Sequence, residues 1–77
     1  METVQELDMV VLLRALPEHG LQAGDIGAVV HCYSDDQGLE VEFVTGSGET
    51  VAVVTLERSA VRLMKEGEIL HVRDLAA

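Results

Sequence analysis

Hydrophobic and polar residues alternate most regularly in the middle of the chain, from Leu39 to Thr45. The apolar positions are Leu39, Val41 and Phe43, and the acidic positions between them are Glu40 and Glu42. A period of two is typical of an antiparallel strand that has one face against a core and the other face in water. The pattern therefore predicts a strand here, with both glutamates on its wet face.

Other apolar runs are bounded by turn-forming residues, which indicates further strands. These runs are MVVLLRAL after Asp8, Ile26 to Tyr33, Thr50 to Leu56 and Val61 to Met64. The first run is short and β-branched at its centre, so we expect a strand that is buried on much of both faces. Pro17 ends this strand because proline has no N–H for a ladder. The stretch ERSA, at 57–60, fits a single helical turn.

The longest connection runs from Glu18 to Gly27 and contains three glycines, Gly20, Gly24 and Gly27. We expect these glycines to serve turns that need a positive φ. A phosphate-binding glycine loop is not expected, because the IGAVV that follows is a strand rather than a helix and no lysine ends the motif.

Short strands joined by tight turns after one long first loop predict an all-β fold, a small antiparallel barrel. A flat meander would leave an apolar face open, so the sheet must curl or find a partner. The predicted division is an N-terminal extension over 1–7, the barrel over 8–64 and a C-terminal tail over 65–77.

The tail has two readings. Ile69, Val72 and Leu75 or Ala76 recur at helical spacing, whereas EILHV fits an extra strand. We favour a short helix, whose apolar face covers one mouth of the barrel or docks on another chain.

Charge narrows the classes of partner. The chain has 14 acidic and 5 basic residues, a net charge of −9. Residues 1–56 hold ten acids and one base, Arg14, whereas residues 57–77 hold four of each. Such a field repels phosphate backbones and speeds encounters with basic proteins. We therefore expect no direct nucleic-acid binding and a basic protein partner, with acidity for solubility alone as the alternative.

Candidate metal and nucleophile residues are few and badly spaced. They are His19, His31, Cys32 and His71, with no C-x2-C or H-x3-H pair among them. His31 and Cys32 are adjacent, so in a strand they point to opposite faces. The acidic neighbours of Cys32 would raise its thiol pKa, which favours a small buried hydrophobe over a nucleophile. A chain of 77 residues also has little interior left for a substrate cavity. We expect no enzyme, no cofactor and no metal.

Cysteine usage and the chain's first residues bear on its compartment. A single cysteine excludes an internal disulfide, and METVQELD is acidic where a signal peptide would be basic. No segment approaches the roughly 20 apolar residues of a membrane span. The expectation is a reduced, soluble, cytoplasmic protein that does not bind membranes.

The order of motifs resembles a known family. The motifs are D-x-V-V-L-L at Asp8 to Leu13, P-E-H-G-L at Pro17 to Leu21, G-D-x-G at Gly24 to Gly27, V-V-H at Val29 to His31, V-E-F at Val41 to Phe43, and T-L at Thr55 and Leu56. As a set they resemble the small SH3-like barrels and, more narrowly, the uncharacterised bacterial family called domain of unknown function four-nine-two-six. The resemblance covers Asp8 to about Met64.

The resemblance implies a five-stranded antiparallel SH3-like barrel with a short C-terminal tail. In it, Ala15 to Asp25 forms the long loop after the first strand, and ERSA is the turn before the last. It brings no catalytic residues. It also suggests, by analogy, a partner encoded by a neighbouring gene, in the manner of antitoxins or immunity proteins.

These observations together predict a non-catalytic protein-binding module. The favoured version is the acidic antitoxin or immunity component that neutralises a basic enzyme such as a nuclease toxin. Its expected partner-binding residues are Glu18, His19, Asp25, Asp35, Asp36, Glu40 and Glu42. The alternative is a structural accessory subunit or a self-associating barrel, a homo-oligomer, in which the tail docks.

Overall fold

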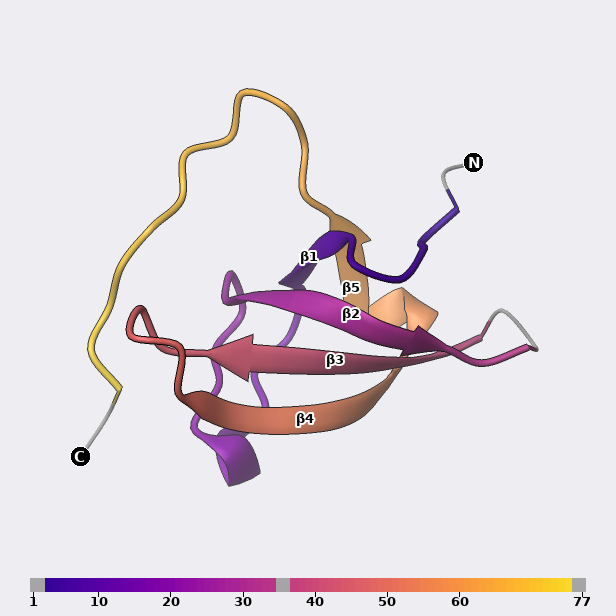
Figure 1. Ribbon diagram of the computed structural model, residues 1–77. Helices are drawn as coiled ribbons and strands as arrows, with labels where there is room; N and C mark the ends of the chain where they lie inside the picture. The colour runs from indigo at the N-terminus through magenta and orange to yellow at the C-terminus, as the bar shows by residue number, and fades with distance from the viewer. Residues whose placement is uncertain (1–2, 35–36, 76–77) are drawn as a thin grey trace.

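The computed structural model describes residues 3–34 and 37–75 (Figure 1). Its strands are β1 (Met9–Leu12), β2 (Ile26–Cys32), β3 (Gly38–Val44), β4 (Thr50–Glu57) and β5 (Val61–Leu63). They form one antiparallel sheet in the order β4-β3-β2-β1-β5. Two 3-10 turns, η1 (Pro17–His19) and η2 (Arg58–Ala60), interrupt the connections. The all-β, five-stranded prediction is confirmed, and η2 is the helical turn predicted for ERSA.

The sheet curls around a core but does not close into a barrel. After η2 the chain changes direction and β5 pairs with β1, so β4 and β5 lie at opposite ends of the strand order. Among the described residues no ladder joins these two strands. Of the predicted small barrel, the structure shows the curled five-stranded antiparallel sheet without closure by hydrogen bonds. β5 has only three residues, and its described ladder is with β1.

The core lies on the concave side of the sheet. Its most deeply buried side chains are Val10, Leu12, Val29, Val41 and Val61. Alternation along β3 follows the predicted pattern, since its three apolar side chains are buried and its glutamates are half-buried on the other face. In β1, by contrast, Met9 is 45% exposed, so this strand is buried on one face rather than on much of both.

The long loop uses its glycines in two ways. Gly20 and Gly24 have φ of 69° and 95°, in the left-handed region that favours glycine. Gly27 was predicted to serve a turn, but it lies inside β2, where a Cβ atom would come within 2.6 Å of Val41 Cγ1. Gly27 therefore permits close packing of β2 on β3 rather than a turn.

The tail is neither the predicted helix nor an extra strand. Residues 65–75 follow an extended path away from β5 and back towards the long loop (Figure 1). Gly67, with φ of 86°, turns the chain early in this segment, and nearby Glu68 forms an ion pair of 2.6 Å with Arg62. Ile69 and Val72 are 91% and 87% exposed, so the apolar spacing finds no surface to pack on and no helix forms.

The residues before β1 contribute to the core. Val4 is buried, and the backbone N–H of Leu7 donates to the carbonyl of Val29 at 2.7 Å.

No helix among the described residues is long and apolar enough to cross a bilayer.

Candidate protein-binding face

The convex face of β3 and β4 brings acidic and hydroxyl side chains together. The ladder places Glu40 opposite Thr55 and Glu42 opposite Val53, all on the side away from the core. Tyr33 follows β2 and reaches the same face. We call this surface the glutamate face; it consists of Tyr33, Glu40, Glu42, Thr50, Val53 and Thr55.

Neutral hydroxyl groups orient both glutamates. Glu40 accepts hydrogen bonds from the Tyr33 hydroxyl, at 3.0 Å, and from the Thr55 hydroxyl. Glu42 accepts one from the Thr50 hydroxyl at 2.8 Å. Because the Tyr33 proton is bonded to Glu40, the pKa of the phenol is raised above its ordinary value of 10.0. The hydroxyls restrict the carboxylates without cancelling their charge.

Within the part of the chain that the structure describes, no lysine or arginine pairs with Glu40 or Glu42. The ranges 26–32, 38–44 and 50–57, which form β2, β3 and β4, contain no lysine or arginine. Three of the described arginines are engaged elsewhere: Arg62 with Glu68, Arg73 with Asp25, and Arg58 with the carbonyl of Val61. The glutamate face therefore presents two preorganised negative charges beside an apolar side chain, Val53, which is half-exposed.

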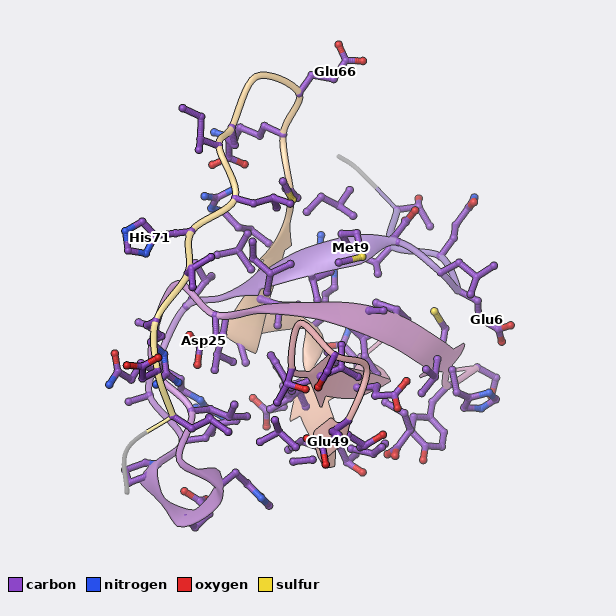
Figure 2. The ribbon with its side chains drawn as sticks, turned by 60° about the vertical axis from the view of Figure 1, so that its left-hand side comes forward. Glu6, Met9, Asp25, Glu49, Glu66 and His71 are labelled. Carbon is purple, nitrogen blue, oxygen red and sulfur yellow. The ribbon has the colours of Figure 1, made fainter. Side chains whose placement is uncertain are left out.

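Asp25 was predicted to be exposed and partner-binding, but it is already paired. Its carboxylate accepts two hydrogen bonds from Arg73, from Nε at 2.8 Å and from Nη2 at 2.5 Å. Its side chain is only 18% exposed, and it lies beside the tail in Figure 2. The hydrogen bond from Arg73 holds the pKa of Asp25 below its ordinary value. The pairing corrects the expectation that Asp25 is an exposed residue, since its carboxylate holds the tail.

The other predicted contact residues are spread over the molecule. Glu18 and His19 are exposed on η1, an element that contributes no residue to the glutamate face. Asp35 and Asp36 lie outside the described residues. Of the predicted contact residues, Glu40 and Glu42 lie together on β3, whereas Glu18 and His19 form a separate surface on η1.

His31 and Cys32 lie on different sides of the sheet, in agreement with strand parity. A register shift between Val29 and His31 marks a bulge at this point of β2. The Cys32 thiol lies 3.6 Å from the carbonyl oxygen of Val4 and packs against the core. The His31 ring is exposed, 4.8 Å from the Tyr33 ring in an edge-on contact and 3.7 Å from Glu6. The described residues contain no group of three or more histidine, cysteine or acidic side chains arranged to hold a metal ion.

One hollow also lies on the surface. Leu7, Met9, Leu63 and Met64 border it, and it opens broadly to solvent. Enclosed sites for small molecules are concave and exclude most water, which this hollow does not. The glutamate face is the better candidate for a functional surface.

Comparison with known proteins gives a family. The model of a family described as "Domain of unknown function (DUF4926)" matches residues 6–63. The chain belongs to the DUF4926 family. The resemblance seen in the sequence motifs is thereby confirmed, and the match runs from just before β1 to the last residue of β5. The tail of this DUF4926 protein lies beyond the match. No curated protein and no solved structure matches the chain.

Proposed function

We propose that this DUF4926 protein is a non-catalytic protein-binding module whose glutamate face engages a basic partner. The observation that carries the proposal is the pair Glu40 and Glu42, held by neutral donors on strands that contain no lysine or arginine. The curled five-stranded sheet is what we expect of an SH3-like small barrel with one open seam, acting in the bacterial cytoplasm.

Electrostatics favour such a contact. A carboxylate fixed by hydroxyl groups loses little side-chain entropy when a cation approaches, because its rotamer is already restricted. Close charge pairs across an interface couple by roughly 1.5 to 7 kcal/mol in the best-studied case. The net charge of −9 also steers basic proteins towards the surface.

The most specific form of the proposal is an antitoxin or immunity protein. Its partner is a basic enzyme, such as a nuclease, that is inhibited when the acidic surface covers its positive cleft. The net charge and the small size support this form, together with the analogy to small acidic partners of neighbouring genes. The test is co-expression with the product of the adjacent gene. We expect co-purification and relief of any toxicity; failure of both contradicts the proposal.

The exposed tail favours a second function, that of a structural accessory subunit or self-associating module. Its apolar side chains Ile69, Leu70 and Val72 are among the most exposed in the described chain. Large exposed apolar side chains in one segment mark a docking element.

Two variants separate the functions. Removal of residues 66–77 abolishes association if the tail docks, and leaves association intact if the glutamate face binds. Charge reversal at Glu40 and Glu42 has the opposite pattern. The same co-purification assay reads both variants.

A further inference from the structure

The two edges of the sheet are built differently. The strand order leaves β5 at one edge and β4 at the other. An unpaired edge strand offers a row of N–H and C=O groups to another chain, and proteins usually protect it. The protection visible at β5 is missing at β4.

Arginine side chains occupy the β5 edge. Met64 N donates to Met9 O at 3.1 Å, and Leu13 N donates to Ala60 O at 2.8 Å. Hydrogen-bonded pairs alternate with non-bonded ones along an antiparallel ladder, so Val61 and Leu63 turn their backbone groups outward. Their carbonyls accept bonds from Arg58 Nη1 at 3.0 Å and from Arg62 Nη1 at 3.1 Å. β5 also has only three residues, so both its length and the arginine side chains protect this edge from pairing with another chain.

The ladder shows which backbone groups face outward from β4. Arg58 N donates to Gln37 O at 2.7 Å, which sets the alternation for the pairs that follow. By this alternation Leu56, Val54 and Ala52 turn their backbone groups to β3. The outward set is Val53, Thr55 and Glu57. No other described strand pairs with this side of β4.

β4 lacks the short length, proline and basic side chains that commonly protect an edge strand. β4 has eight residues with no proline, lysine or arginine. Its one irregularity, a register shift opposite Val44, lies at the start of the strand and leaves 52–57 regular. The charged residues that flank the edge within and before β4 and on the neighbouring strand are negative: Glu49, Glu57, Glu40 and Glu42. Arg58 follows β4, but its guanidinium donates to the carbonyl of Val61.

We propose that the β4 edge accepts an extended segment of a partner protein in which basic and apolar residues alternate, as an added strand. Such a strand lies about 5 Å from β4 and about 10 Å from β3. The long side chains of lysine or arginine, together with Glu40 and Glu42, span that gap. Apolar residues of the segment fall on the opposite side, where they extend the core beside Val54. The choice of a basic partner rests on the proposed function; the added strand rests on the edge itself.

Charge disfavours pairing along the full length of β4 with a second copy of this chain. If β4 paired antiparallel with β4 of another copy about Val53, Glu49 of one chain would lie opposite Glu57 of the other, twice. Like charges directly opposite each other destabilise a sheet. A cationic strand removes this repulsion.

The test uses a synthetic peptide of about seven residues, alternating lysine and valine with blocked ends. Amide hydrogen exchange by NMR follows the N–H groups of Val53, Thr55 and Glu57. With saturating peptide we expect the exchange rates of these amides to fall to about a tenth of their free value or lower. Val53→Pro removes one outward N–H, whereas Val53→Ala keeps it. Both variants shorten the Val53 side chain, so the difference between them reports the backbone N–H alone. We expect Val53→Pro to weaken peptide binding by up to about tenfold more than Val53→Ala does.

Two control peptides keep the result decisive if Val53→Pro fails to fold. One has an N-methyl group on every residue, which removes the backbone donors of both edges but keeps the charge; we expect it not to bind. The other has threonine for lysine, and its equal binding would overturn the basic character of the partner. Binding of the lysine peptide without protection of the three amides overturns the added strand while leaving the glutamate face as a binding surface. Absence of peptide binding, or protection that rises with protein concentration alone, also overturns the proposal.

Discussion

Replacing Asp25 with asparagine removes the charge that holds the tail. Both partners of the Asp25 and Arg73 pair are partly buried, with side chains 18% and 26% exposed, and the guanidinium binds in a two-pronged geometry. Fully exposed pairs couple by about 0.2 to 1 kcal/mol, and the geometry here places this pair near the upper end, at about 1 kcal/mol. For a domain of this size that corresponds to a fall in Tm of roughly 4 to 8 °C.

A double-mutant cycle measures the coupling. The variants are Asp25→Asn, Arg73→Gln and the double variant, compared by urea unfolding at pH 7. The described tail buries no large apolar side chain, so we also expect the backbone of 69–74 to show lower NMR order parameters in either single variant. Arg73→Lys serves as the control that keeps the charge and loses the two-pronged geometry. A coupling energy near zero with unchanged order parameters in the tail would refute the role given to this pair.

The pH dependence of this pair has a definite sign. Arg73 lowers the pKa of Asp25 in the folded state below its ordinary value of 3.8. Stability from the pair is therefore complete above the unfolded pKa and is lost as pH falls through the folded pKa. The difference in unfolding free energy between the wild type and Asp25→Asn should be constant near neutrality and shrink below pH 3.8. A difference that grows on acidification would contradict the assignment.

Three further predictions concern packing, backbone and titration. Gly27→Ala should cost about 1 to 3 kcal/mol, because its Cβ would meet the Glu42 carbonyl oxygen at 3.0 Å, whereas Gly46→Ala, in open space, should be near neutral in thermal unfolding. Leu7→Gly should stabilise the fold by roughly 1 kcal/mol, since Leu7 is exposed with φ of 75°; a loss of stability would count against strain at this residue. In Glu40→Gln the pKa of the chain's single tyrosine should fall towards 10.0, as followed by phenolate absorbance, and an unchanged pKa would mean that Glu40 does not cause the shift.

The strands could be predicted from the sequence because their signals are local. Period-two alternation located β3, and turn residues at the ends of the apolar runs located the other strands to within a few residues. Side-chain parity also separated His31 from Cys32. Each of these inferences needs only neighbouring residues and the geometry of an extended chain.

The remaining features depend on contacts between distant parts of the chain. Asp25 meets Arg73 across 48 positions, and no pattern near either residue indicates the pair. The tail shows helical spacing, but a short isolated helix is marginal in water and this one has no surface to pack on. The hydroxyls of Tyr33 and Thr55 reach Glu40 only because of the cross-strand register, which the sequence does not give. The contrast between the two edges likewise appears only once the strand order is known.

Binding of the adjacent gene's product, measured by titration calorimetry, tests the role of the glutamate face most directly. The variant is Glu40→Gln with Glu42→Gln, and the matched control is Glu66→Gln with Asp74→Asn, which changes the net charge equally on the exposed tail (Figure 2). If the glutamate face binds, the first variant weakens Kd by about ten- to a hundredfold and loses part of the salt dependence, while the control stays close to the wild type. Equal affinities for the wild type and the Glu40 and Glu42 variant would contradict the proposed function.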